Sequence, residues 1–92
     1  MIAGFRHRGL RRLFETYDRS RIPPQHVERI RLILADLDAA GSIEHLHRPG
    51  YRLHALKGRL RGHYAIDVSA NWRIVFRFEA GYASNIDLMD YH

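Results

Sequence analysis

Cysteine is absent from the sequence, and lysine occurs only once. The lack of cysteine excludes disulfides and thiolate metal sites. No apolar run approaches the ~20 residues that a membrane-spanning helix requires, and residues 1–6 lack the apolar core of a signal peptide. These absences predict a cytoplasmic protein without a membrane segment.

The chain has little room for more than one folding unit. Its 92 residues can bury one modest core, so we expect a single domain over residues 1–92. Hydrophobic residues make up 46% of the chain and charged residues 27%, which is ordinary for a globular protein and argues against disorder.

Acidic residues are missing from the segment 45–66, in a chain whose net charge is +5. Lys57 is the single lysine, so the other permanently cationic side chains are all arginines. The cations of the segment are Arg48, Arg52, Lys57, Arg59 and Arg61. The fixed fork of arginine suits bidentate phosphate contacts and stacking on bases. The segment therefore favours a nucleic-acid partner, with an acidic protein partner or a solvated basic face as the alternatives.

The first half of the chain has a helical period. We expect a short strand at Ile2–Phe5, followed by an amphipathic helix in which apolar residues recur at i, i+3, i+4 and i+7 between Leu10 and Tyr17. Pro23-Pro24 predicts the start of a second helix. The apolar stripe of that helix runs from Val27 to Leu37, and Gly41 is a natural stop.

After Pro49-Gly50 the apolar period changes from 3.6 to 2, which is typical of strands with one wet face. Three such segments are 51–56, 63–68 and 72–78, and a fourth strand follows the turn at 79–81. The predicted fold class is α+β, in the order β-α-α-β-β-β-β, with the helices on one face of an antiparallel sheet.

The last hairpin can be given a predicted register. A three-residue loop at 79–81 pairs apolar residues of the two strands with one another. It also sets Arg73 opposite Asp87 and brings Asp90 beside Ala70. In that register Arg73 could form a cross-strand ion pair, or the carboxylate could present it to a phosphate, and both interpretations remain open.

The sequence predicts neither a metal site nor a cofactor. His45 and His47 lack a third ligand at matching spacing. The chain contains no phosphate-binding Walker loop, no glycine-rich dinucleotide fingerprint and no nucleophile elbow.

Six residues remain that could together cleave RNA without a metal. Such cleavage needs a base for the 2′-OH proton, cations for the charge that builds on the phosphate, and an acid for the leaving 5′-oxygen. The candidates are His54, Lys57, Arg73, Asp90, Tyr91 and His92. An exposed histidine in a basic hairpin is the simpler interpretation of His54.

Four segments carry a family resemblance that extends over essentially the whole chain. They are Met1-Ile2-x-x-Phe5, Arg52-Leu53-His54-x-Leu56-Lys57-Gly58, Asn71-Trp72-Arg73-Ile74 and the terminal Asp90-Tyr91-His92. In order and spacing they resemble the HigB-type toxins, also called plasmid maintenance killer proteins, of the RelE superfamily.

The resemblance implies a RelE-like fold, with a small curved antiparallel sheet and two N-terminal helices. It also implies a ribosome-dependent mRNA endonuclease that is monomeric when free. A helix-turn-helix antitoxin of the HigA type would neutralise it in a hetero-oligomer. The family's active-site positions match the same six candidates, with His92 and Asp90 transferring protons and His54 as the alternative base. Lys57 and Arg73 would hold the phosphate, and Tyr91 would orient a base or ribose.

Further arginines are expected to contact mRNA or ribosomal RNA. They are Arg8, Arg11, Arg12, Arg52, Arg59 and Arg61. The three on the first helix could equally face an acidic antitoxin surface. Two competing functions remain: a ParE-like toxin that acts on DNA gyrase, and a nucleic-acid-binding module without catalysis.

Overall fold

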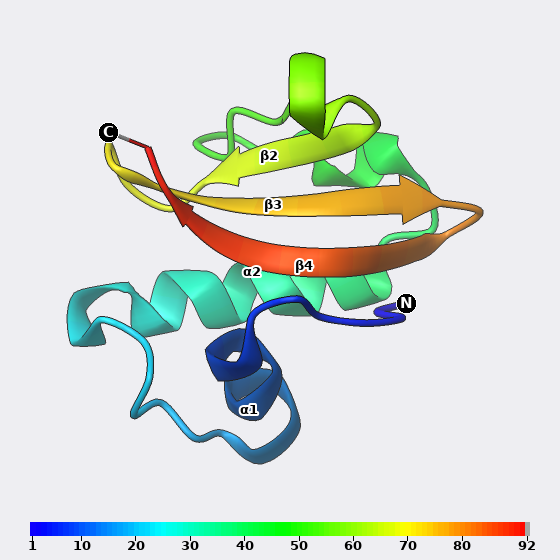
Figure 1. The fold of residues 1–92 in the computed structure, drawn as a ribbon. Helices are drawn as coiled ribbons and strands as arrows, with labels where there is room; N and C mark the ends of the chain where they lie inside the picture. Colours follow the sequence, from blue (N-terminus) through cyan, green and yellow to red (C-terminus); the bar gives the residue numbers. More distant parts are fainter. Residues whose placement is uncertain (92) are drawn as a thin grey trace.

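The computed structural model describes residues 1–91 and shows two helices packed on one face of a four-stranded antiparallel sheet (Figure 1). The helices are α1 (Arg8–Thr16) and α2 (Val27–Ala39), and the strands, in sheet order, are β1 (His54–Ala55), β2 (His63–Asp67), β3 (Trp72–Glu79) and β4 (Tyr82–Asp90). Short 3₁₀ turns occupy Pro24–His26, Ile43–Leu46 and Gly58–Leu60. The predicted α+β class is confirmed.

Helix α1 is one residue shorter at its end than the apolar spacing suggests. Tyr17 adopts a left-handed conformation with φ 60°, its N–H donates to the carbonyl of Leu13, and the N–H of Asp18 donates to the carbonyl of Arg12. This cap turns the Tyr17 side chain away from the core, so 70% of the residue is exposed. The Arg31 guanidinium lies 5.1 Å from the centre of its ring.

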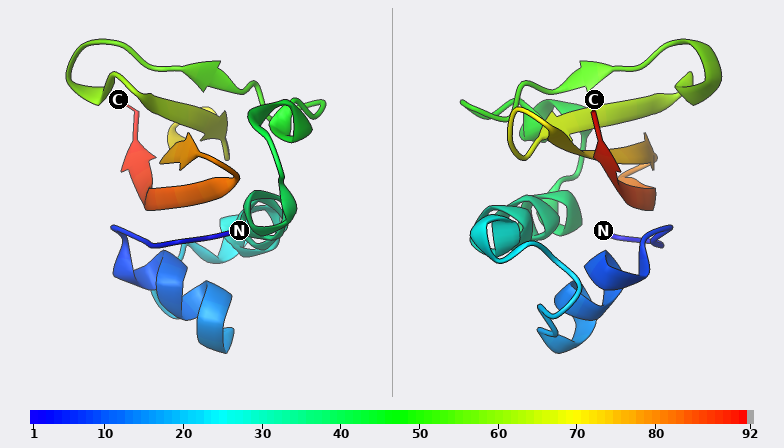
Figure 2. Two further views of the ribbon diagram at one scale, coloured as in Figure 1. Left: turned by 90° about the vertical axis from the view of Figure 1, so that its right-hand side faces the viewer. Right: turned by 60° about the vertical axis from the view of Figure 1, so that its left-hand side comes forward.

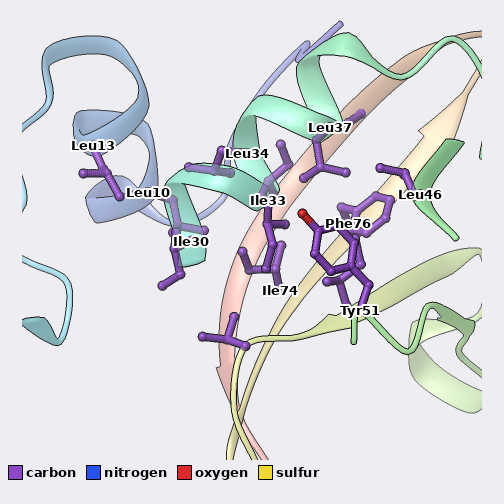
Figure 3. Close-up of a cluster of buried hydrophobic side chains, with 14 of the residues drawn as sticks. Leu10, Leu13, Ile30, Ile33, Leu34, Leu37, Leu46, Tyr51, Ile74 and Phe76 are labelled. Atoms are coloured by element: carbon purple, nitrogen blue, oxygen red, sulfur yellow. The ribbon is translucent and has the colours of Figure 1, made fainter. Parts of the chain in front are cut away.

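The core lies between the helices and the sheet. Ile30, Ile33 and Leu37 of α2 point toward Ile74 and Phe76 of β3 (Figure 3). The largest fully buried side chains are Phe76, Leu10, Leu13, Ile30, Ile33, Leu34, Leu37, Leu46, Ile66, Ile74, Ile86 and Val27. Figure 2 shows both helices on the same side of the sheet, while the segment that joins β1 to β2 stands on the other side.

Two predicted strands are shorter than expected. The opening segment makes only isolated parallel bridges to β4, from Ile2 to Ala83 and from Phe5 to Ile86. The segment 51–56 contributes only His54–Ala55 to the sheet. Arg52 has a φ of 51°, and this left-handed residue interrupts the extended backbone immediately before the strand.

The β3–β4 hairpin differs from the predicted register. Its loop has two residues, Ala80 and Gly81, because Glu79 pairs with Tyr82. Their φ values of 52° and 82° suit the tight primed turns of hairpins. The pairing also shifts between Val75 and Arg77.

The predicted cross-strand partners are therefore wrong. Arg73 pairs with Met89 and not with Asp87, which lies opposite Val75. Asp90 pairs with Trp72 and does not lie beside Ala70. The loop and the bulge each displace the register by one residue, so β4 is displaced by two residues at its end. Beyond the bulge Leu88 still faces the core, because the displacement there equals the two-residue period of a strand. Between the loop and the bulge the displacement is one residue, so Ala83 is buried and Tyr82 is 50% exposed.

Alternation leaves one face of the sheet without a helix on it, and we call it the helix-free face. Its side chains are His63, Ala65, Asp67, Arg73, Val75, Arg77, Asp87 and Met89, as the cross-strand pairs of β2, β3 and β4 require. Within residues 1–91, neither helix has the length and apolar character that crossing a bilayer demands.

Candidate active site

Arg73 lies at the centre of a side-chain cluster on the helix-free face. Its Nε is 3.2 Å from Asp67 Oδ1, and its Nη1 is 3.4 Å from His54 Nε2. The Tyr91 ring covers the guanidinium, with its centre 3.5 Å from Cζ. Tyr91, which follows β4 (Figure 1), is hydrogen-bonded to Asn71 in the turn between β2 and β3, so the structure gathers residues from β1, β2, β3 and the segment after β4 around one cation.

Asp67 is a member of this cluster that the sequence did not indicate. It pairs with Arg73 across the strands and also forms an ion pair with Arg52, whose Nε is 3.5 Å from Oδ2. Within residues 1–91, neither Asp67 Oδ1 nor Arg73 Nε has a partner with hydrogen-bond geometry. Their 3.2 Å contact is therefore electrostatic, and it holds the Nε edge of Arg73.

The backbone beside Asp67 is supported from the helical layer. Arg29 of α2 donates from Nη2 to the carbonyl oxygens of Asp67, at 2.8 Å, and Gly50, at 2.7 Å. This contact joins α2 to the end of β2. The sequence marked Asp67 only as the first acidic residue after the segment 45–66. No feature of the sequence indicated that Arg29 supports this site, because Arg29 lies on a helix far away in sequence.

His54 is oriented by the unusual backbone before it. Its Nδ1 lies 2.8 Å from the carbonyl oxygen of Arg52, the residue with positive φ. Only a protonated Nδ1 can donate to that oxygen, which in the neutral ring leaves a lone pair on Nε2. This lone pair faces Arg73 Nη1, so a potential proton acceptor lies directly beside a permanent cation.

Tyr91 is held at both its backbone and its ring. Its N–H donates to the carbonyl of Asn71, and its ring stacks on Arg73. Such a contact is worth about 0.5–1 kcal/mol at exposed sites and more where water is excluded. Because Tyr91 remains 43% exposed, its outer edge is open to a ligand.

Of the other predicted catalytic residues, Lys57 and Asp90 lie outside this cluster. Lys57 is exposed at the start of the β1–β2 connection, and no hydrogen bond or ion pair of its side chain is found within residues 1–91. The pairing of Asp90 with Trp72 directs its side chain to the face opposite Arg73. His92 lies outside the described residues.

The predicted RNA-binding arginines fall into two groups. Arg52, Arg59 and Arg61 are exposed on the segment that runs through β1 into β2, and Arg52 joins the Asp67 ion pairs. The second group, Arg8, Arg11 and Arg12, is exposed on α1 in the helical layer. The structure therefore does not combine the six into one surface with Arg73.

The cluster has the parts needed to bind a phosphate and move a proton. Arg73 supplies a fixed cation, His54 supplies an imidazole with a free lone pair, and Tyr91 supplies a flat ring and a phenol. No group of three metal-ligating side chains occurs in the part of the chain that the structure describes.

The chain is similar to known proteins over its whole length. The chain is 46% identical over 92 residues to the Endoribonuclease HigB of Proteus vulgaris, covering 100% of both chains. Two solved YoeB–YefM structures from Staphylococcus aureus, one described as a heterotetrameric toxin–antitoxin complex, share its fold. Each matches with a TM-score of 0.66 at 20% identity, over 100% of this chain and 95% of theirs.

A family model matches residues 3–92, and its description is "RelE-like toxin of type II toxin-antitoxin system HigB". The family model covers almost the entire chain, and the 46% identity to a relative of the same length supports the same family. The chain therefore belongs to the HigB-like toxins, which are RelE-like toxins of type II toxin–antitoxin systems.

Proposed function

We propose that this chain is an endoribonuclease that cuts mRNA on the ribosome by metal-free acid–base catalysis. The observation that carries the proposal is the cluster in which Arg73 contacts His54, Asp67 and Tyr91 on the helix-free face. The name of the Proteus vulgaris relative supports RNA cleavage. Dependence on the ribosome follows from the family resemblance.

The chemistry requires no group beyond side chains. The 2′-OH of one nucleotide attacks the adjacent phosphorus and loses its proton to a base. The bond to the 5′-oxygen breaks, and an acid protonates that oxygen. The products are a 2′,3′-cyclic phosphate and a 5′-OH end. Each correctly placed acid or base accelerates such a reaction by about 10²–10⁴-fold.

We assign the phosphate to Arg73, which stabilises the charge that develops on its oxygens, with Lys57 as the second cation. We assign the removal of the 2′-OH proton to His54, whose Nε2 lies 3.4 Å from Arg73 Nη1. His92 is the candidate for protonating the leaving oxygen, because the Asp90 side chain is directed to the face opposite Arg73. Tyr91 packs against the ribose or a base with its exposed edge.

Two kinds of partner complete the proposal. A helix-turn-helix antitoxin of the HigA type would neutralise the toxin, which is consistent with the family description and with the YoeB–YefM complexes. The ribosome would present the mRNA. The exposed arginines Arg59 and Arg61, with Lys57 between β1 and β2, are suited to phosphate contacts near the site.

The proposal is tested with purified protein and ribosomes that hold a defined mRNA. Wild type should cut the mRNA within the translated frame and leave cyclic phosphate ends, and naked mRNA should remain intact. Arg73→Ala and His92→Ala should each reduce the cleavage rate by about 10²-fold or more. Arg19→Ala, which removes an exposed arginine between the helices, should cut like wild type.

Three results would contradict the proposal. Efficient cleavage of naked RNA would remove the ribosome dependence. Intact mRNA together with inhibited DNA gyrase would favour the ParE-like function. Salt-sensitive RNA binding without any cleavage would favour a non-catalytic module.

A further inference from the structure

A cavity opens on the helix-free face, outside the Arg73 cluster. Its volume is about 310 Å³, near the lower end of the ~300–1,000 Å³ of small-ligand sites. The residues that line it are Arg6, Arg59, Leu60, His63, Val75, Asn85, Asp87 and Met89.

This cavity lies next to the Arg73 cluster along the sheet. Met89, which lines it, pairs with Arg73, and Val75 pairs with Asp87 at the next position on the same face. Residues two apart on a strand are separated by roughly 7 Å. An RNA strand with its phosphate on Arg73 therefore has a neighbouring base within reach of the cavity.

The lining combines an apolar surface with a polar rim, as nucleobase sites require. Leu60, Val75 and Met89 provide the apolar surface, and Val75 is 2% exposed. Asp87 and Arg6 lie on the rim, with Asp87 Oδ2 3.9 Å from Arg6 Nε. Such a site suits a flat base, because the face of a base packs on apolar groups while its edge forms hydrogen bonds.

The rim groups are held in place by backbone contacts. Asp87 Oδ1 accepts from the N–H of Leu88 at 2.9 Å. The N–H of Arg6 donates to the carbonyl of Ile86 at 2.8 Å. A carboxylate has about four acceptor positions and no donor, so Asp87 retains acceptor capacity toward the cavity.

We infer that this cavity binds one base of the RNA substrate and that Asp87 selects bases with an amino group on the pairing edge. The inference rests on the proposed function. Adenine, cytosine and guanine carry such an amino group, which donates to a carboxylate. Uracil presents a ring N–H between two carbonyl oxygens, and the carboxylate repels those oxygens. Uracil is therefore disfavoured.

Binding is measured without cleavage by titrating the full chain with each nucleoside 5′-monophosphate in turn and recording backbone amide NMR shifts. AMP, CMP and GMP should shift the amides of Asn85, Asp87 and Met89. UMP should bind about fivefold more weakly or worse, as expected for loss of a base-edge contact. Asp87→Asn keeps the size of the side chain and an acceptor for the Leu88 N–H. It should remove the difference between the nucleotides.

Specificity is measured by mapping the cut positions on ribosome-bound mRNAs. Wild type should show a deficit of uracil at one fixed position beside the cleaved bond, and Asp87→Asn should lose that deficit. Glu79→Gln removes the same charge from an exposed side chain at the far end of β3 and should keep the deficit.

The two measurements separate this inference from the proposed function. Equal shifts with all four nucleotides, or shifts confined to residues outside the cavity, would overturn the base pocket even if wild type cuts mRNA. Selective shifts in a protein that cuts nothing would support the pocket and contradict the endonuclease.

Discussion

The two faces of the sheet are built from the same strands and have opposite characters. Toward the helices, Ile66, Ile74 and Phe76 are fully buried. One residue along the chain, Asp67, Arg73 and Arg77 point the other way and are partly exposed. Each strand of the pair β2–β3 thus contributes alternately to the core and to the candidate site.

This arrangement separates stability from chemistry at the level of single residues. Burial of apolar side chains stabilises the fold by roughly 25 cal/mol per Å² of area removed from water. Partly exposed ion pairs contribute little by comparison. Substitutions on the two faces should therefore have different effects, even when the residues are close in sequence.

The largest contrast is expected between Phe76→Ala and Arg73→Ala. Phe76→Ala should lower the free energy of unfolding by about 3–5 kcal/mol, because a fully buried ring is lost and a cavity remains. Arg73→Ala should lower it by about 1 kcal/mol or less, because Asp67 keeps its ion pair with Arg52. Urea denaturation measures both, and equal losses would refute the separation of the two faces.

Asp67→Asn should sharpen the comparison within the helix-free face. Losing the carboxylate charge frees the Nε edge of Arg73, and misplacing a catalytic group can cost up to about 10²-fold in rate. We expect a drop of roughly tenfold or more in kcat with little change in KM. Single-turnover cleavage of ribosome-bound mRNA measures this drop, with Glu44→Gln as the control. Unchanged kcat would show that Arg73 needs no support from Asp67.

Tyr51→Phe tests a charged network that borders the core. Tyr51 is 3% exposed and donates a hydrogen bond to Asp36, which also pairs with Arg48 at 3.2 Å. Burial, followed by this hydrogen bond, raises the pKa of Tyr51 to about 12. Losing a hydrogen bond to a charged group should cost about 1.5 kcal/mol.

The same substitution predicts a pH effect. Because the folded protein holds the Tyr51 proton more tightly than the unfolded chain, this stabilisation is complete below pH 10 and is lost between pH 10 and about 12. Thermal unfolding measured across that range should show a smaller loss of stability with pH in Tyr51→Phe than in wild type. Identical slopes would contradict the assignment.

The smallest effect is expected for Tyr91. Tyr91→Phe keeps the ring over Arg73 and should retain most of the activity, whereas Tyr91→Ala removes the cation–π contact, worth about 1 kcal/mol. A loss of about fivefold in cleavage rate for Tyr91→Ala alone would follow from that energy. If Tyr91→Phe is as impaired as Tyr91→Ala, the phenol takes part in proton transfer.

Much of the fold was predictable from local patterns. The change from a helical to a strand period after residue 50 correctly predicted two helices followed by antiparallel strands. The predictions that failed concern backbone conformation. The positive φ values of Arg52 and Asn85 shorten β1 and accompany the bulge of β4. Asparagine adopts this conformation more often than most residues do, but neither side chain requires it.

The candidate site was predictable only in part. His54, Arg73 and Tyr91 were identified as candidates, and the structure brings them into contact. Asp67 was missed because its role depends on the cross-strand pair with Arg73. That pair joins different strands, so no spacing along the chain reveals it.

The sequence by itself determined the alternation of apolar and polar side chains, the basic character of the segment 45–66 and the family motifs. Tertiary structure alone decided what Arg73 contacts. The β3–β4 register sets Met89, two residues from Asp87, opposite Arg73, and the separate β2–β3 register sets Asp67 opposite Arg73. The physical reason is that strand pairing depends on turn and bulge geometry, while the hydrophobic pattern specifies only which face each side chain occupies.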